Sequence, residues 1–296
     1  MNVRIVEVGP RDGLQNEAAK IPTDAKVAFV DALSEAGYDE IEVSAFVSPK
    51  WVPQLADAEE VFARIRRREG VVYSALVPNA EGLKRAMAAR AGKIAVFTAA
   101  SETFNRKNIN ASIDESIERF APVVPEARAT GIAVRGYIST AFWCPYEGKI
   151  EPAAVMKVAR RLIELGVDEL SIGDTIGKAV PAEVHALLDV LLDAAPQDAI
   201  AMHFHDTYGT GIANALAAYE RGITIFDASA RGVGGCPYAP GAAGNVATED
   251  LAWALARSGA TLTLDLDRVN AASDVLAAAL GRPLRSRVRE AMRGTS

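Results

Sequence analysis

The chain has 296 residues, of which 50% are hydrophobic and 24% charged, a balance typical of a globular protein rather than a disordered one. Its net charge of −6 and isoelectric point near 5.3 argue against wholesale binding to nucleic-acid backbones, which needs clustered Lys and Arg. A local basic patch for a phosphorylated small molecule is compatible with these values. We therefore expect no nucleic-acid partner.

No apolar run approaches the roughly 20 residues that a membrane-spanning helix needs, so we expect no membrane association. The N-terminal stretch MNVRIVEVGPRDG passes directly into a strand pattern and lacks the apolar region of a secretory signal. The two cysteines, Cys144 and Cys236, are too few for a disulfide framework. Together these features predict a cytoplasmic protein with reduced thiols.

Short apolar, β-rich runs alternate with longer helical patterns. The expected strands are 4–8, 40–46, 71–77, 94–100, 132–138, 169–174, 199–205 and 223–230. The helical patterns that follow them are 23–37, 56–70, 80–92, 112–131, 151–166, 181–196, 211–222 and 247–259. Eight such repeats in about 250 residues predict a (β/α)8 TIM barrel with right-handed crossovers. A doubly wound sheet is the alternative, but no GxGxxG motif follows the first strand.

Local signals agree with these assignments. In the pattern 151–166, Pro152 stands at the first helical turn and Gly166 at the expected C-terminal cap. Between them Val155, Val158, Leu162 and Leu165 form one apolar helix face. We expect residues 1–296 to form a single catalytic barrel domain, with about 260–296 as an appended C-terminal helical segment.

Active sites of such barrels lie where the strands end and the βα loops begin. Unusual polar residues fall at or near these places, and they are Arg11, Asp12, Glu42, Asp174, His203, His205, Cys236 and Asn245. They come from the first, second, sixth, seventh and eighth repeats. Distant parts of the sequence are therefore predicted to meet at one face of the barrel.

His203 and His205 are the most informative pair. Residues i and i+2 of a strand point the same way, so both imidazoles are expected in one space, with Phe204 turned toward the helices. Two convergent imidazoles chelate a divalent cation well, and Asp12 and Asn245 are the natural candidates for further ligands. A mixed nitrogen and oxygen set favours Mg²⁺ or Mn²⁺ over tetrahedral Zn²⁺. The spacing alone is equally compatible with two buried histidines bonded to backbone.

The segment 232–245, GVGGCPYAPGAAGN, contains five glycines and two prolines. Such a loop can approach a ligand closely or close over a site. Cys236 within it is a candidate acid, base or nucleophile, and the alternative is a small buried hydrophobic residue. Cys144 and His185 are interpreted as structural residues.

Several motifs occur in an order that resembles one known family. They are VGPRDGLQNE, EVSAFVSPKWVPQ, KNIN, CPYEGKI, SIGDTIG, HFHDTYG and GGCPYAPGAAGN. Together they resemble the 3-hydroxy-3-methylglutaryl-CoA lyase family of metal-dependent TIM barrels, from about residue 3 to about residue 280. The arginine–aspartate pair and the H-x-H motif mark the wider superfamily, whereas the cysteine loop is more specific to the lyases.

The resemblance implies a role for each matching position. Asp12, His203, His205 and Asn245 correspond to ligands of Mg²⁺ or Mn²⁺. Arg11 corresponds to the substrate-binding cation that stabilises an enolate oxygen, and Glu42 to its orienting partner. Asp174 corresponds to an active-site carboxylate, and Cys236 to a loop thiol needed for turnover.

The implied reaction is cleavage of the acyl-CoA substrate 3-hydroxy-3-methylglutaryl-CoA to acetoacetate and acetyl-CoA, a step of leucine degradation and ketone-body metabolism. The family also implies a homodimer. Asp12, Asp174 and His205 are all candidates for the group that removes the hydroxyl proton. Trp143 is bulkier than the resemblance leads us to expect; it either lines the acyl pocket or packs beneath its loop.

Other functions are compatible with the same residues. A lyase for a longer 3-hydroxyglutaryl-CoA homologue and an aldol-type lyase of the same superfamily are the nearest alternatives. A condensing synthase fits the cysteine loop less well. A catalytically inactive scaffold is disfavoured because every position expected to do chemistry holds a competent residue.

Overall fold

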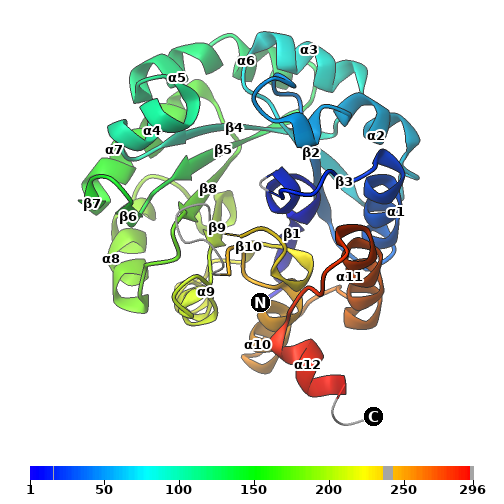
Figure 1. Cartoon of the computed structure of the whole chain (residues 1–296). Coiled ribbons are helices and arrows are strands. Elements are labelled where there is room, and N and C mark those ends of the chain that lie inside the picture. The colour runs from blue at the N-terminus through cyan, green and yellow to red at the C-terminus, as the bar shows by residue number, and fades with distance from the viewer. Residues whose placement is uncertain (16, 236–242, 294–296) are drawn as a thin grey trace.

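The strands form a closed parallel barrel in the computed structural model, which describes residues 1–15, 17–235 and 243–293. Around the barrel the strands follow the order β1-β10-β9-β8-β5-β4-β3-β2 (Figure 1). Their bounds are β1 (Arg4–Glu7), β2 (Glu40–Ala45), β3 (Val72–Leu76), β4 (Lys93–Ala99), β5 (Ala133–Ser139), β8 (Glu169–Asp174), β9 (Ile200–Phe204) and β10 (Ile225–Ala228). This topology confirms the predicted (β/α)8 TIM barrel.

Helices surround the barrel as an outer layer (Figure 1). They include α1 (Thr23–Ser34), α2 (Ala58–Arg64), α3 (Ala80–Ala88), α5 (Ile113–Phe120), α6 (Val123–Ala129), α7 (Pro152–Leu165), α8 (Pro181–Leu191), α9 (Gly211–Glu220) and α10 (Thr248–Arg257). Two further helices, α11 (Leu266–Leu280) and α12 (Arg287–Arg293), form the predicted C-terminal extension, and α11 packs against α1. Within the described ranges, no helix has both the length and the hydropathy to cross a bilayer.

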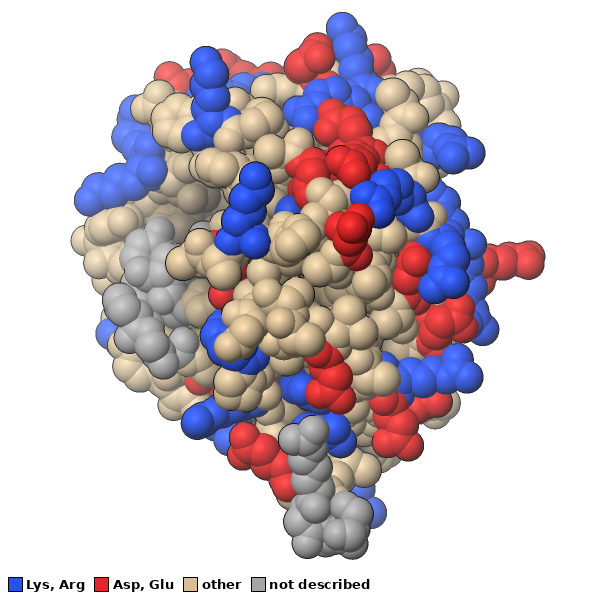
Figure 2. Space-filling view, turned by 45° about the vertical axis from the view of Figure 1, so that its right-hand side comes forward, with Lys and Arg blue, Asp and Glu red and all other residues tan. Residues whose placement is uncertain are grey.

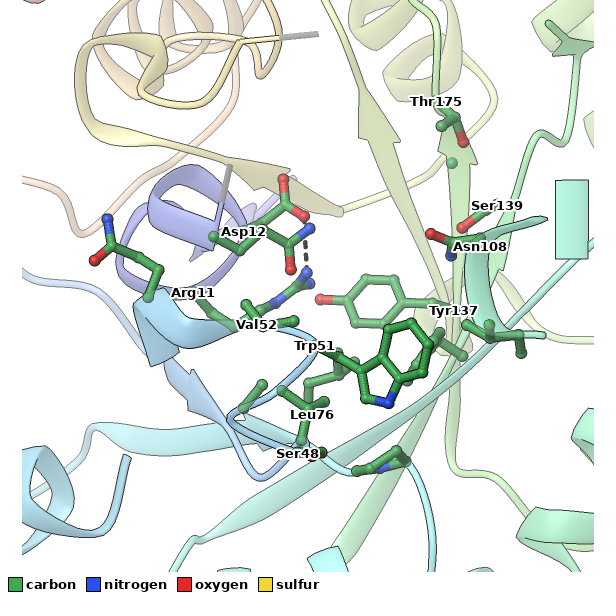
Figure 3. A pocket seen from close by; sticks show the side chains of 18 of the residues that line it. Arg11, Asp12, Ser48, Trp51, Val52, Leu76, Asn108, Tyr137, Ser139 and Thr175 are labelled. Carbon is green, nitrogen blue, oxygen red and sulfur yellow. Dashed lines mark hydrogen bonds and ion pairs between the residues drawn. The ribbon is translucent and has the colours of Figure 1, made fainter. Parts of the chain in front are cut away.

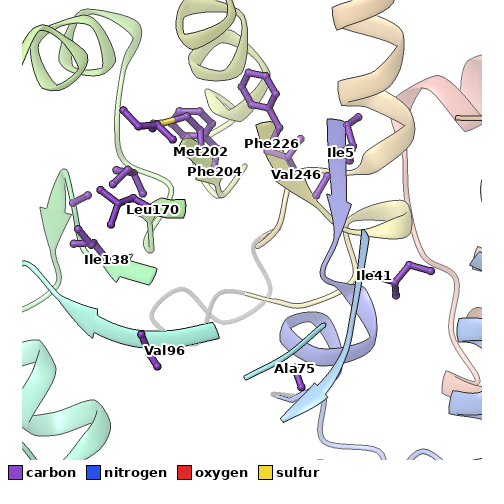
Figure 4. Close-up of a cluster of buried hydrophobic side chains, with 14 of the residues drawn as sticks. Ile5, Ile41, Ala75, Val96, Ile138, Leu170, Met202, Phe204, Phe226 and Val246 are labelled. Atoms are coloured by element: carbon purple, nitrogen blue, oxygen red, sulfur yellow. The ribbon is translucent and has the colours of Figure 1, made fainter. Parts of the chain in front are cut away.

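The main hydrophobic core fills the space between strands and helices. Strand residues such as Ile5, Val96, Leu170 and Phe226 turn outward into it (Figure 4). Phe204 lies in this core and packs against Phe142, as the alternation of strand side chains predicts. Burial of this apolar surface is the main free-energy gain that stabilises the packing of the outer helices on the barrel strands.

The barrel interior, in contrast, contains charged side chains. We call Glu40, Lys93, Arg135, Glu169 and Asp227 the barrel charge network. Lys93 Nζ donates to Glu40 Oε2 at 2.9 Å and to Glu169 Oε1 at 3.0 Å. Arg135 donates from Nε to Glu169 Oε1 at 2.5 Å and from Nη1 to Asp227 Oδ1 at 2.6 Å. All five residues are buried, so each charge depends on its partners for the solvation that water would provide.

Three local features differ from the sequence expectations. The single helical pattern 112–131 forms two helices, α5 and α6, because Pro122 interrupts it. A further helix, α4 (Glu102–Ile109), and a hairpin of β6 (Trp143–Cys144) with β7 (Gly148–Lys149) lie in segments without predicted structure. Strand β9 ends at Phe204, so His205 lies just beyond it and forms an isolated bridge with Asn245.

Charges of both signs are mixed on the outer surface. On the face shown in Figure 2, Lys and Arg side chains alternate with Asp and Glu, most densely on its right-hand side. Many of them form exposed ion pairs, such as Arg64 with Glu60 and Arg66 with Asp31. Exposed pairs of this kind contribute little to stability. The face in Figure 2 therefore does not present the single-sign surface that binding to a nucleic-acid backbone would need.

Candidate active site

A tight helical turn, η1 (Gly9–Gly13), follows β1 and brings two charged residues to the barrel mouth. The Val8 carbonyl accepts hydrogen bonds from the backbone N–H groups of Arg11, Asp12 and Gly13. Glu7 Oε1 accepts from Gly9 N at 2.9 Å and from Ala230 N at 3.0 Å, which ties the turn to the segment that follows β10. A Cβ atom on Gly9 would lie 2.5 Å from this oxygen, so the turn requires glycine there.

Arg11 is held on both sides by carboxylates. Its Nε and Nη2 each lie 2.7 Å from Glu42 Oε2, and its Nη1 donates to Asp12 Oδ1 at 2.7 Å. Its guanidinium also lies over the ring of Tyr137, 5.3 Å from the centroid (Figure 3). Burial disfavours the charged form, but Glu42 and Asp12 outweigh it and hold the pKa of Arg11 above its ordinary value. The result is a permanent cation in a fixed orientation at the cavity wall.

His203 and His205 face the same space, as the i, i+2 spacing predicts. Their ring centroids lie 5.3 Å apart, and each residue is about 8% exposed. Burial and the neighbouring His203 lower the pKa of His205 to about 4, so its imidazole is neutral near pH 7 and free to bind a cation. Within the described residues, its Nδ1 is buried without a hydrogen-bond partner.

Asn245 completes this group of side chains. Its Nδ2 donates to Asp12 Oδ2 at 2.9 Å and to the Val233 carbonyl at 3.1 Å. Its Oδ1 is buried and makes no hydrogen bond to any described residue. An unpaired buried acceptor is costly unless a ligand satisfies it.

The donor set fits a divalent cation. One ligand atom from each of Asp12, His203 and His205 lies within 4.8 Å of the other two. The buried, unpartnered Asn245 Oδ1 adds to the case, because it is an acceptor that no described residue satisfies, and a neutral His205 ring always offers one nitrogen lone pair. Burial would raise the pKa of Asp12, but Arg11 and both histidines lower it overall and keep the carboxylate ionised.

These groups open into a cavity of about 960 Å³. Figure 3 shows Arg11 and Asp12 on η1, facing Tyr137 from β5 and Thr175 from the loop after β8. Three cations, Lys20, Lys107 and Arg119, also line the cavity, and all three are exposed. The cavity therefore combines a buried metal-ligating group with exposed positive charge.

Asp174 ends β8 as predicted but is not brought into the cavity. Its Oδ1 accepts from Lys178 N at 3.1 Å and its Oδ2 from Ala179 N at 3.0 Å. Among the described residues that line the cavity are its neighbours Gly173 and Thr175, which alternate with it. Burial raises the pKa of Asp174 to about 6. This carboxylate fixes the loop between β8 and α8.

Two other residues were of interest in the sequence, Cys236 and Trp143. Cys236 lies outside the described residues, although the preceding Gly235 lines the cavity. Trp143 is not among the described residues that line the cavity. Its Nε1 donates to Glu183 of α8 at 3.1 Å, and Lys178 Nζ lies 3.9 Å from its ring centroid, which favours the packing alternative.

Sequence reasoning missed Tyr137 and Asp227. Tyr137 lines the cavity under Arg11, and Asp227 Oδ2 lies 3.2 Å from His203 Nδ1. The available signal for Asp227 was an acidic residue inside the otherwise apolar run ITIFDASA. A buried acid in a barrel strand needs a partner, and the strand neighbours could have been searched for one.

The fold and site define a class: a (β/α)8 barrel with a histidine–carboxylate centre and a buried arginine at its mouth. The model of the family described as HMGL-like matches residues 2–276. A relative from Bos taurus, "Hydroxymethylglutaryl-CoA lyase, mitochondrial", is 50% identical, with 98% of this chain and 89% of the relative covered. This chain belongs to the HMGL-like family.

Solved structures agree with this assignment. A hydroxymethylglutaryl-CoA lyase from Pseudomonas aeruginosa is 47% identical with a TM-score of 0.97, covering 100% of this chain and 98% of that one. An HMG-CoA lyase from "Acenitobacter baumannii", described in complex with coenzyme A and 3-methylmalate, is 38% identical with a TM-score of 0.93. That match covers 98% of this chain and 95% of the other.

Proposed function

We propose that this chain is a 3-hydroxy-3-methylglutaryl-CoA lyase that releases acetoacetate and acetyl-CoA. The observation that carries the proposal is that Arg11, Asp12, His203 and His205 line one cavity, with Asn245 hydrogen-bonded to Asp12. Relatives with this name match the chain over nearly its whole length, which supports the same reading.

Asp12, His203, His205 and Asn245 would hold the divalent ion. Their mixed nitrogen and oxygen donors suit Mg²⁺ or Mn²⁺. When bound, such an ion acts as a Lewis acid that lowers the pKa of a substrate hydroxyl and helps to fix the substrate. Imidazole bases that are neutral near pH 7 favour this binding, and His205 meets that condition because its pKa is lowered to about 4.

Arg11 would stabilise the charge that develops during cleavage. As the C2–C3 bond breaks, its electron pair moves onto the acetyl-CoA fragment, and negative charge grows on the thioester oxygen. Glu42 and Asp12 already fix the guanidinium, so little reorganisation is needed when this charge appears. Because the charge is greater in the transition state than in the substrate, such a contact raises kcat.

The hydroxyl proton must leave the substrate, and the enolate carbon must gain a proton. The backbone contacts of Asp174 favour a loop-anchoring role over proton removal, which leaves Asp12 and His205 as candidate bases. The Cys236 thiol is the proposed proton donor to the enolate. The resemblance of the loop motif GGCPYAPGAAGN to that of the lyases supports this role.

Cys236→Ala should abolish most turnover while leaving substrate binding intact, because it removes a proton donor and little contact area. Steady-state kinetics and equilibrium binding of the substrate measure the two effects. Unchanged kcat would exclude the thiol from the reaction, and loss of binding would indicate a structural role instead.

An acyl-CoA substrate fits the cavity. Lys20, Lys107 and Arg119 offer exposed positive charge to coenzyme A phosphates, while the metal-ligating group is buried. The relative described in complex with coenzyme A supports this substrate class.

The decisive experiment incubates the purified chain with 3-hydroxy-3-methylglutaryl-CoA and measures acetoacetate and acetyl-CoA. We expect release of both, loss of activity with EDTA, and recovery with Mg²⁺ or Mn²⁺. Activity that survives EDTA contradicts the metal-dependent mechanism. Turnover only with a longer 3-hydroxyglutaryl-CoA homologue or with an aldol substrate would reassign the substrate. If the chain showed no metal binding and no turnover, a scaffold function would be indicated.

The remaining expectations from the sequence stay predictions. They are the homodimer, the cytoplasmic localisation, the single-domain organisation over 1–296 and the place in leucine degradation and ketone-body metabolism.

A further inference from the structure

Asp227 lies directly beside the first histidine of the candidate metal centre. Strand β10 pairs in parallel with β9, and the register places Asp227 opposite His203. The Asp227 side chain is fully buried. An ionised carboxylate at such a position needs several donors to offset its lost hydration.

Those donors come from three strands. Arg135 Nη1 on β5 donates to Asp227 Oδ1 at 2.6 Å, and Ser171 Oγ on β8 donates to Asp227 Oδ2 at 2.9 Å. His203 Nδ1 on β9 lies 3.2 Å from the same Oδ2. Because both oxygens are engaged, the carboxylate has a fixed place, and the imidazole that donates to it acquires a fixed orientation.

His205 offers an internal contrast. In the described part of the chain, its Nδ1 has no hydrogen-bond partner. The two imidazoles face the same space, but of their Nδ1 atoms only that of His203 has a carboxylate partner among the described residues. The asymmetry indicates that Asp227 does more than balance charge inside the barrel.

Charge balance alone would be met by Glu169. This residue accepts from Arg135 Nε at 2.5 Å and from Lys93 at 3.0 Å, and it also pairs with Arg4. Within the described residues, Glu169 makes no hydrogen bond or ion pair to a histidine, whereas Asp227 contacts both Arg135 and His203. The two acids thus share one arginine, and of these two acids Asp227 is the one that contacts a histidine of the site.

We propose that Asp227 is a positioning residue that holds the His203 ring with its proton on Nδ1, so that Nε2 presents its lone pair to the divalent ion. Arg135 and Ser171 in turn hold Asp227. This role rests on the metal centre of the proposed function and adds a residue that supports one of its ligands. A carboxylate behind a ligating histidine fixes the tautomer and makes the ring a better ligand, and its loss typically weakens metal binding about 10–100-fold.

The first test compares Asp227→Asn with Glu169→Gln by Mn²⁺ binding, followed by electron paramagnetic resonance of free Mn²⁺. Both variants remove one negative charge from around Arg135, but only the first touches His203. We expect a 10–100-fold rise in the Mn²⁺ Kd for Asp227→Asn and a much smaller change for Glu169→Gln. Equal losses in the two variants would assign the effect to charge or folding and overturn the proposal.

The second test needs no substitution at Asp227. Nitrogen-15 NMR of the histidine side chains of the metal-free chain, recorded above the pH at which the imidazoles titrate, should show the His203 proton on Nδ1. His203→Gln identifies the signal. A proton on Nε2 would overturn the proposal, even if Asp227→Asn failed to fold.

Mn²⁺ binding distinguishes an error in the metal centre from an error in the role of Asp227. Absence of Mn²⁺ binding by the unchanged chain would contradict the metal centre itself. Mn²⁺ binding with equal affinity in the unchanged chain and in Asp227→Asn would contradict only the role of Asp227.

Discussion

The barrel charge network and the residues at the barrel mouth are both buried and both polar, yet they satisfy their hydrogen bonds differently. In the network, every carboxylate lies against a lysine or arginine of the same chain, and the network atom buried without a partner among the described residues is Arg135 Nη2, a donor rather than an acceptor. At the mouth, within the described ranges, His205 Nδ1, Asn245 Oδ1 and Glu42 Oε1 are buried without partners.

This difference separates structural charges from chemical ones. A pair that is complete within the protein has no bonding capacity left for a ligand, whereas an orphaned acceptor gains most from one. Substitutions in the two regions should therefore have different effects. Changes in the network should mainly reduce stability and changes at the mouth should mainly reduce turnover, with Asp227, which contacts both Arg135 and His203, as the exception.

Arg11→Gln should produce the largest effect at the mouth. It removes the cation proposed to stabilise the enolate oxygen, so kcat should fall about 10²–10³-fold. The Mn²⁺ Kd should change far less, because the histidines and Asn245 remain. A kcat close to that of the unchanged chain would remove Arg11 from the reaction.

Lys93→Met makes the matching change inside the barrel. It leaves Glu40 and Glu169 buried with fewer cations, and breaking such a pair typically costs about 3–5 kcal/mol of stability. Urea unfolding measures the loss, while kcat well below the unfolding temperature should stay near its original value. A large fall in kcat at full folding would show that the two regions are not separable.

Glu7→Gln tests the anchor of the turn η1. Burial raises the pKa of Glu7 from 4.5 to about 7, so the folded chain binds this proton more tightly than the unfolded chain. The resulting stability is present below pH 4.5 and is lost as the pH rises through about 7, by up to about 3 kcal/mol. Unfolding free energies between pH 4 and 8 should therefore decline less steeply in Glu7→Gln; parallel profiles would refute this assignment.

Trp143→Phe should have the smallest effect. It removes a partly exposed hydrogen bond to Glu183 but keeps a ring beneath Lys178, so we expect a loss of about 1 kcal/mol. Relative kcat/KM values for acyl-CoA thioesters of different lengths should not change. An altered chain-length preference would place the ring in the acyl pocket after all.

The alternating pattern of short and long segments predicted the barrel because strand and helix periods differ and each repeat ends at a turn signal. The i, i+2 spacing of His203 and His205 likewise predicted their convergence, because it is a local property of an extended chain. The split of the pattern 112–131 at Pro122 is also a local property, because proline interrupts a helix.

Long-range pairings were not accessible in the same way. The contact of Asp227 with His203 depends on which strands are neighbours and on their register. The turning of Asp174 toward backbone N–H groups depends on where β8 ends relative to its loop. The order of residues shows that Asp227 is an acid within an apolar run, but it does not show which partner either Asp227 or Asp174 contacts.

Arg11 and Asp12 are consecutive residues on one turn, so the group proposed to stabilise the enolate and a group proposed to bind the metal cannot move independently. A single peptide unit limits the separation between the anion-stabilising group and the cation-binding group. Glu7 binds the start of the same turn at Gly9 N and the segment after β10 at Ala230 N. Substitutions on this side of the cavity that would accommodate other acyl chains would therefore also disturb the reacting groups. Variation at Leu76, Phe97 and Val52, which line the cavity without binding either group, is the route by which substrate range can change while the chemistry is preserved.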